Sequence, residues 1–227
     1  MSARGRSVLD MRGLIIKDIF ILKKNVKIFV VLIVLYVFMS FASNDTSFFN
    51  SVITMLFAIL ILNLYAFDDA AKWDSFALTL PISKDNIVQE KYLMMLLLTM
   101  TGSAVCSIFT IISNITRKSD SIFHGFEIIG IGAVVVIIFY SIILPAITKL
   151  GVEKARIIIF AIYLIPFVIF MALKKMQGDI KLPIPGTLLK LVDLLIKNIF
   201  VVLSLTAVIA LLVSYEISIR IYRKKEF

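Results

Sequence analysis

Residues 126–144, FEIIGIGAVVVIIFYSIIL, form an almost uninterrupted apolar run. A helix needs about 20 apolar residues to cross the roughly 30 Å hydrocarbon core of a bilayer, so a run of this length can span it. Five similar runs lie at residues 27–42, 50–67, 93–113, 157–173 and 198–215. They do not alternate between apolar and polar residues as the strands of a membrane barrel do. The sequence therefore predicts an all-α membrane protein whose single domain, residues 1–227, has six transmembrane helices.

The basic residues fall unequally on the two sides of the membrane that these runs define. The chain has 24 Lys and Arg against 15 Asp and Glu, for a formal net charge of +9. With the N-terminus inside, seventeen of the basic residues face the cytoplasm and seven face the exterior. Loops rich in Lys and Arg remain in the cytoplasm, so we expect both termini there. Because topology explains the basic charge, we expect no nucleic-acid partner.

Sequence motifs for catalysis or metal binding are absent. Cys106 and His124 are the only cysteine and the only histidine, which excludes an intramolecular disulfide and a zinc cluster of His or Cys residues. The chain has no GxxxxGK(S/T) phosphate loop and no HExxH motif, and its apolar runs contain no paired carboxylates. We therefore expect no enzymatic activity, no catalytic or metal-binding residue and no cofactor in this chain.

Residues 8–25, just before the first run, have the pattern of an amphipathic helix. The apolar stripe comprises Met11, Ile15, Ile19, Leu22 and Val26, and the polar stripe comprises Asp10, Lys17 and Lys24. A helix with basic residues on its polar face lies in the membrane interface rather than across the bilayer. We expect an interfacial helix here.

Residues 174–197, between the last two runs, form the longest outer loop. After Pro183 and Pro185, charged residues recur at helical spacing among leucines. Two interpretations are open. The segment either re-enters the outer leaflet as an amphipathic helix, or it is the early start of the last transmembrane helix.

Residues 68–91 form a cytoplasmic loop between the second and third runs. Asp68 and Asp69 favour the positive N-terminal end of a short helix, and Pro81 ends that helix. Ser83 is expected to cap a second helix that continues into the third run. The stretch is therefore predicted to fold as a helix, a proline turn and a second helix.

This cytoplasmic loop is expected to expose aromatic and apolar residues beside charged ones. The group comprises Lys72, Trp73, Asp74, Phe76, Leu78, Lys84 and Asp85. Protein interfaces favour such a mixture. Trp73 has an alternative role, because interfacial tryptophans often anchor at the level of the lipid headgroups. Periodicity does not separate the two roles.

Polar residues within the apolar runs are few. Asn63 is the candidate for a substrate pathway, and an interhelical hydrogen bond is its alternative role. Tyr163 and Pro166, in the fifth run, are further pathway candidates, and Pro166 is expected to kink its helix.

The stretch FDDAAKWDSFALTLPISKDNIVQEKYL, residues 67–93, closely resembles the first cytoplasmic loop of ABC-2-type transporter permeases, especially small bacterial ones. The shared pattern is an acidic start, Lys-Trp, a Thr-Leu-Pro-Ile-Ser turn, and Lys-Tyr at the entry to the next span. The N-terminal stretch MRGLIIKDIFILKKN resembles the opening of the same family. The remainder agrees in span number and topology. Within the family, the chain is most similar to permeases that export amphipathic peptides, such as phenol-soluble modulins, lantibiotics and other antimicrobial peptides.

The resemblance implies two permease subunits that work with two separate ATPase subunits, which bind ATP and Mg. Residues 69–84 would be the coupling helix that contacts the ATPase. The implied contact residues are Asp69, Lys72, Trp73, Phe76, Leu78, Pro81, Ser83 and Lys84. Pro145–Arg156 would form a second cytoplasmic contact, 8–25 the interfacial connecting helix, and 176–197 the outer re-entrant segment. The chain would be one permease of a homodimer or heterodimer in the bacterial plasma membrane.

Two other function classes are open. The first is a non-transporting membrane scaffold or peptide-immunity protein, which would not bind an ATPase. The second is an ion-coupled transporter or channel, which would need ionisable residues buried within the runs, and the sequence shows none in mid-span.

Overall fold

The computed structural model describes residues 3–43, 46–77, 79–117, 125–161, 164 and 198–225 of the chain. The helices are α1 (Ala3–Ser43), α2 (Thr46–Ala70), α3 (Trp73–Ala77), α4 (Lys84–Thr116), α5 (Phe126–Leu150) and α8 (Ile199–Lys224), and residues 152–161 are also helical. No β-strand occurs within these ranges, which confirms the all-α prediction.

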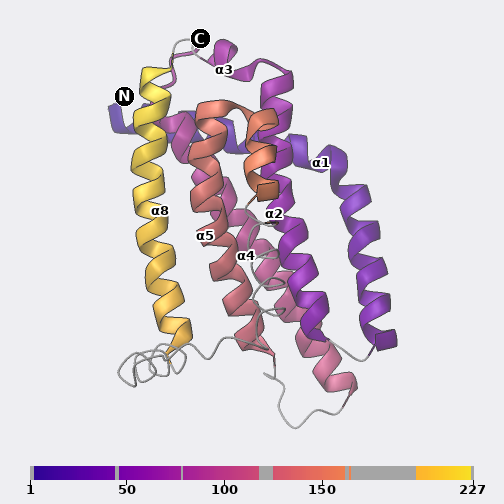
Figure 1. Ribbon diagram of the computed structural model, residues 1–227. Coiled ribbons are helices and arrows are strands. Elements are labelled where there is room, and N and C mark those ends of the chain that lie inside the picture. Colours follow the sequence, from indigo (N-terminus) through magenta and orange to yellow (C-terminus); the bar gives the residue numbers. More distant parts are fainter. Residues whose placement is uncertain are drawn as a thin grey trace, which may run out of the picture.

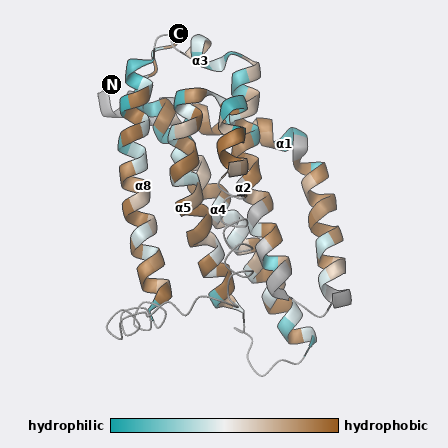
Figure 2. Ribbon diagram, in the orientation of Figure 1, coloured by the Kyte–Doolittle hydropathy of each residue, from teal (hydrophilic) through white to brown (hydrophobic). Residues whose placement is uncertain are grey.

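Four helices in the described part of the chain are long and apolar enough to cross a membrane. They are Val52–Ala70 within α2, Lys84–Thr116, Phe126–Leu150 and Ile199–Lys224. Apolar residues follow these helices along most of their length (Figure 2). The apolar part of α1, Val26–Ser40, is shorter, and most of the predicted span 157–173 lies outside the described residues, as does the predicted outer segment 174–197. The count of six spans stays a prediction.

The helices α2, α4, α5 and α8 run side by side as a bundle, and α1 crosses one end of it before turning to run alongside (Figure 1). α1 contacts both α2 and α4, and α5 contacts α8. The start of α1, the short helix α3 and the end of α8 lie together at the same end of the bundle. We call this the α3 end, and we call the part of α1 before Val26 the crosswise segment.

The start of α4 follows the sequence prediction. The hydroxyl of Ser83 accepts a hydrogen bond from Asn86 N at 3.2 Å, and Asp85 lies in the first turn. Both features stabilise the unpaired backbone N–H groups at a helix N-terminus. The prediction that Ser83 caps this helix is confirmed.

The end of α2 differs from the prediction. α2 continues to Ala70, so Asp68 and Asp69 lie in its last turn rather than at the start of a short helix. The dipole at a helix C-terminus disfavours carboxylates. The cationic and backbone partners described below offset this effect, which is why the prediction from the dipole alone is wrong.

The two helices α2 and α4 approach each other closely. A Cβ atom added to Gly102 in α4 would lie 2.9 Å from side-chain atoms of Phe57 in α2, so a glycine is needed at this spacing. Further along the same contact, Asn50 Nδ2 donates to Thr110 Oγ1 at 2.9 Å. A small residue and a buried hydrogen bond therefore join these two helices.

The apolar core extends to the α3 end. Leu14 of the crosswise segment, Leu64 of α2, Ala77 of α3, Tyr92 of α4 and Ile219 of α8 are buried in one cluster. Burial of apolar surface from five helices in a single cluster fixes α3 against the bundle.

Candidate functional site at the α3 end

A sharp turn places α3 across the end of the bundle. Lys72 has a φ of +49°, in the left-handed region that residues other than glycine rarely adopt, and its backbone N donates to Asp69 O at 3.1 Å. After α3, Thr79 Oγ1 donates to Phe76 O at 2.8 Å. A helix as short as α3 is not stable by itself, so these turns and its tertiary contacts hold it.

The two aromatic residues of α3 have different surroundings. Trp73 is half-buried, and the Lys17 ammonium group lies 4.4 Å from its ring centroid in a cation–π contact. Phe76 is 55% exposed, and its ring centroid is 5.5 Å from that of Trp73. Trp73 thus joins α3 to the crosswise segment, whereas Phe76 faces outward.

Four charged residues from three helices form a closed ring of ion pairs beneath α3. Lys17 Nζ lies 2.9 Å from Asp18 and 2.8 Å from Asp68, and Lys91 Nζ lies 2.8 Å from Asp18 and 2.6 Å from Asp68. We call this group the ionic ring. Lys17 and Asp18 come from the crosswise segment, Asp68 from α2 and Lys91 from α4. Each lysine contacts both aspartates, so the ring is electrically neutral and joins three helices.

The ionic ring is buried except at Lys17, whose side chain is 20% exposed. The exposed fractions of the Asp18, Asp68 and Lys91 side chains are 0%, 9% and 6%. Removing one member of such a network leaves an unpaired buried charge and costs about 3–5 kcal/mol, whereas replacing the whole network with apolar residues is often neutral. The ring therefore specifies how α1, α2 and α4 meet more than it raises stability.

A third carboxyl group adjoins the ring. Glu90 is 1% exposed and lies 3.5 Å from Lys91, and its Oε1 receives no hydrogen bond from a described residue. Burial opposes the ionisation of Asp18, but the Glu90 carboxyl group and the ammonium groups of Lys91 and Lys17 hold the pKa of Asp18 below its ordinary value of 3.8. Asp18 is therefore an anion within the ring.

The C-terminal turn of α8 contacts α3 and the start of α4. Tyr222 Oη donates to Asp74 Oδ1 at 3.1 Å, and Lys225 Nζ lies 3.5 Å from Asp74 Oδ2. Arg223 forms a two-pronged pair with Asp85, with Nε to Oδ1 at 2.8 Å. Lys84 Nζ donates to Lys225 O at 3.0 Å. We call these contacts the α8 clasp, and they join α8 to α3 and to the start of α4.

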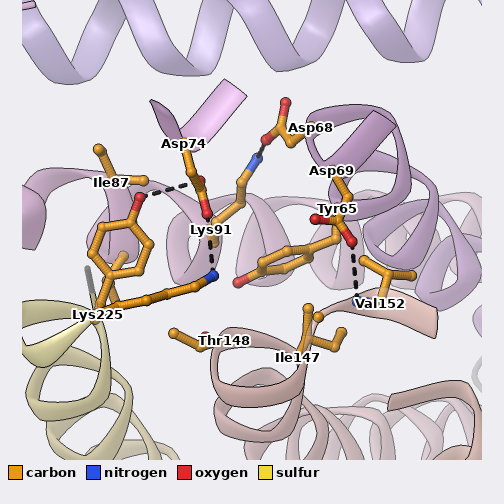
Figure 3. Close-up of a pocket in the computed structure, with 13 residues that line it drawn as sticks. Tyr65, Asp68, Asp69, Asp74, Ile87, Lys91, Ile147, Thr148, Val152 and Lys225 are labelled. Atoms are coloured by element: carbon orange, nitrogen blue, oxygen red, sulfur yellow. Dashed lines mark hydrogen bonds and ion pairs between the residues drawn. The ribbon is translucent and has the colours of Figure 1, made fainter. Parts of the chain in front are cut away.

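A small pocket lies between the ring and the clasp (Figure 3). Asp74 and Lys225 face each other on one side of it, and Lys91 reaches Asp68 on another. The cavity volume of about 40 Å³ is enough for water but not for a peptide or a nucleotide. The pocket is therefore too small to be a cargo or nucleotide site.

Comparison with known proteins gives one family. The profile of a family described as ABC-2 family transporter protein matches residues 13–223. The chain belongs to the ABC-2 transporter family. Neither the curated proteins nor the solved structures contain a match. The family match confirms the resemblance inferred from residues 67–93 and extends it over nearly the whole chain. The chain is thus an integral membrane protein and a membrane component of a transporter.

The coupling residues inferred for an ABC-2 permease lie together at the α3 end. Exposed members of the set are Asp69, Lys72, Phe76, Pro81 and Ser83, whereas Trp73 and Lys84 are partly buried. Leu78 lies outside the described residues. The structure therefore brings the described members of the set to one end of the bundle.

The turn after α5 lies beside these residues. Asp69 Oδ2 accepts a hydrogen bond from Val152 N at 3.3 Å, which joins α2 to this turn. A groove of about 430 Å³ runs from Ala66 and Ala70 to Glu153 and Arg156. The stretch Pro145–Arg156, which the ABC-2 resemblance implies as a second contact, thus borders the same end of the bundle.

The structure gives little support to the residues that were candidates for a substrate pathway. Asn63 is half-buried in α2 and has no hydrogen-bond partner among the described residues. Tyr163 and Pro166 lie outside the described residues. The interhelical hydrogen bond considered for Asn63 is instead made by Asn50.

Sequence reasoning missed the ionic ring. It placed Lys17 on the polar stripe of an interfacial helix, and it found no buried ionisable group because the second apolar run ends before Asp68 and the third begins after Lys91. The adjacent opposite charges Lys17–Asp18 and Glu90–Lys91, each at the edge of an apolar stretch, are the signal that was available.

Proposed function

We propose that the chain is the permease subunit of an ATP-driven exporter, and that its α3 end receives the movement of a separate ABC ATPase subunit. The observation that carries this proposal is the way α3 is held. It presents Phe76 outward while its inner side contacts Lys17 of α1 and Tyr222 of α8. A partner that pushes on α3 would therefore act on α1 and α8 together.

The ionic ring provides a path from α3 into the bundle. Lys17 contacts both Trp73 in α3 and Asp68 in α2, and Lys91 continues the contacts into α4. Because each lysine has two aspartate partners, a helix can shift while every charge keeps one counter-charge. Such a network permits two arrangements of the same helices, which alternating transport requires.

The α8 clasp provides a second path. Asp74 lies in the first turn of α3 and contacts Tyr222 of α8 and Lys225, the residue that follows α8. α8 packs extensively against α5, so a displacement of α3 would be passed to that pair of helices. Both paths begin at α3.

The remaining parts of the proposal follow from the family and the chain's charge distribution. The partner ATPase would bind ATP and Mg, and a second permease copy or paralogue would complete the transporter. Amphipathic or antimicrobial peptides are the proposed cargo. The position of α3 and the described ends of α1 and α8 at one end of the bundle supports a cytoplasmic location for both termini (Figure 1).

Reconstitution with the ATPase subunit tests the proposal. Truncating an interface aromatic commonly costs about 2 kcal/mol or more, or roughly thirtyfold in affinity, so Phe76→Ala should weaken ATPase association by that factor. Phe38→Ala, at an aromatic residue of α1 that is 76% exposed, is the matched control and should bind normally. Robust ATP hydrolysis by the purified chain alone, or unchanged association of Phe76→Ala, would overturn the proposal.

The buried carboxylates favour a second candidate, an ion-coupled transporter. Asp18, Asp68 and Glu90 are each less than 9% exposed, which the sequence had not indicated. Their position at the α3 end and their pairing with lysines suit a junction better than an ion path through the bundle. Peptide uptake into inverted vesicles driven by a proton gradient without ATP would establish this second function instead.

A further inference from the structure

The crosswise segment of α1 has two different faces. Leu14 and Asp18 face the bundle and are buried. The opposite face carries Arg12, Ile16, Ile19 and Lys23, which follow one another at helical spacing and are all exposed. Phe20, on the same side, is 63% exposed. This outer face therefore mixes apolar and basic side chains.

The basic residues of this face have no partner among the residues that the structure describes. Arg12, Lys23, Lys24 and Lys27 form no ion pair or hydrogen bond with any described residue. Four lysines at the same end of the bundle do form such contacts, namely Lys17, Lys84, Lys91 and Lys225. The outer face thus carries unneutralised positive charge beside exposed apolar side chains.

The position of this face relates it to the membrane surface. The crosswise segment lies across the ends of the candidate spans, and the apolar stretch Val26–Ser40 follows it directly (Figure 1). Ile16, Ile19 and Phe20 are more than half exposed, which is unfavourable in water but favourable at the boundary between headgroups and acyl chains. The charges that complement four lysines and arginines at this depth are lipid phosphates.

We propose that the outer face of the crosswise segment, with Lys27 at its end, binds the headgroups of anionic phospholipids. Ile16, Ile19 and Phe20 would enter the acyl boundary, and Arg12, Lys23, Lys24 and Lys27 would contact phosphates. Each basic residue near an anionic surface strengthens binding by roughly fivefold, so loss of three should weaken it about 100-fold. Zwitterionic lipids should bind this face no more tightly than detergent does.

Thermal unfolding of the purified full chain in detergent tests this proposal. The probes are phosphatidylglycerol and phosphatidylcholine, titrated at constant detergent concentration. Phosphatidylglycerol should raise the unfolding temperature, and phosphatidylcholine should not. The variant Lys23→Gln/Lys24→Gln/Lys27→Gln should need about 100-fold more phosphatidylglycerol for half the effect. The effect should weaken at high salt, because surface charges are screened.

A matched variant controls for loss of charge alone. Lys149→Gln/Lys154→Gln/Arg156→Gln removes three exposed basic residues at the α3 end that are not beside an exposed apolar face of α1. It should keep the wild-type response within about twofold. If the triple Lys variant does not fold, Lys24→Gln alone should shift the half-effect by roughly fivefold.

Three results would overturn the proposal. Equal stabilisation by phosphatidylcholine and phosphatidylglycerol would leave only an apolar contact. Glycerol phosphate at the same concentration could reproduce the effect, which would indicate a phosphate site without a lipid. Equal losses in the two triple variants would show that overall charge is responsible.

Discussion

Lys91 Nζ lies 2.8 Å from Asp18 Oδ2 and joins residues that are 73 positions apart in the chain. The pair connects the first helix, which crosses the end of the bundle, to the N-terminal part of α4. Both side chains are almost inaccessible to solvent. Four predictions follow from this pair and from the contacts around it.

Lys91→Met should destabilise the protein by about 3–5 kcal/mol, because Asp18 and Asp68 would share one remaining lysine. Thermal unfolding in detergent measures this loss. Lys149→Met, at an exposed lysine, is the control and should change stability little. The variant Lys17→Met/Asp18→Leu/Asp68→Leu/Lys91→Met should recover most of the loss while transport stays impaired. Normal transport by this apolar variant would show that the ring only fills space.

Acid should destabilise the contact between the crosswise segment and α4. The pKa of Asp18 is lowered in the folded protein, so its contribution is present above the ordinary value of 3.8 and is lost as the pH falls below it. Trp73, the only tryptophan, lies beside the ring, and its fluorescence can report the change. Asp18→Asn should be less stable at pH 7 but less sensitive to acid. A pH profile of Asp18→Asn parallel to that of Glu153→Gln, an exposed control, would contradict this prediction.

Tyr222→Phe should weaken the attachment of α8 to α3 by about 1 kcal/mol, because it removes the hydroxyl that donates to Asp74. Its effect should not add to that of Asp74→Asn, since both changes remove the same contact. Stability measurements on the two single variants and the double variant give the coupling energy. Tyr215→Phe is the control, because no described residue is hydrogen-bonded to its hydroxyl. Strict additivity would mean that the bond contributes nothing.

Ser83→Ala should destabilise the start of α4 by about 1 kcal/mol through loss of the N-cap. Hydrogen exchange of the first-turn amides, beginning with Asn86, measures the effect locally. Ser75→Ala changes an exposed serine within α3 that has no such bond and should leave exchange unchanged. Equal protection in both variants would indicate that other contacts hold this turn.

The apolar runs and the helix start at Ser83 could be predicted from sequence, because both depend on residues close together in the chain. The orientation of the crosswise segment could not be predicted from sequence. Periodicity placed Ile19 and Val26 on one apolar stripe but did not indicate which side of the helix faces the bundle, and in the structure they are 52% and 46% exposed while Asp18 is fully buried. A membrane protein can expose apolar side chains to lipid and bury charges that pair with other helices. Which face turns inward therefore depends on partners distant in sequence.

The same limit applies to Asp68 and Asp69. A helix dipole predicts a carboxylate at a helix start, yet both residues lie in the last turn of α2. The groups that stabilise these carboxylates are Lys17, Lys91 and the backbone of Val152. These groups are distant in the sequence, so a local pattern does not indicate the contacts. The clustering of the inferred coupling residues was foreseeable, because they are consecutive in the chain; the contacts that hold them were not.

The close approach of α2 and α4 restricts where a cargo can move. Gly102 against Phe57, Asn50 against Thr110, and Asp68 against Lys91 fasten the two helices at successive levels from one end to the other. Separating the two helices would break an ion pair and a buried hydrogen bond, and it would also remove the packing contacts between them. The pair should therefore tilt as one rigid unit, and a transported molecule would pass beside this unit rather than between its two helices.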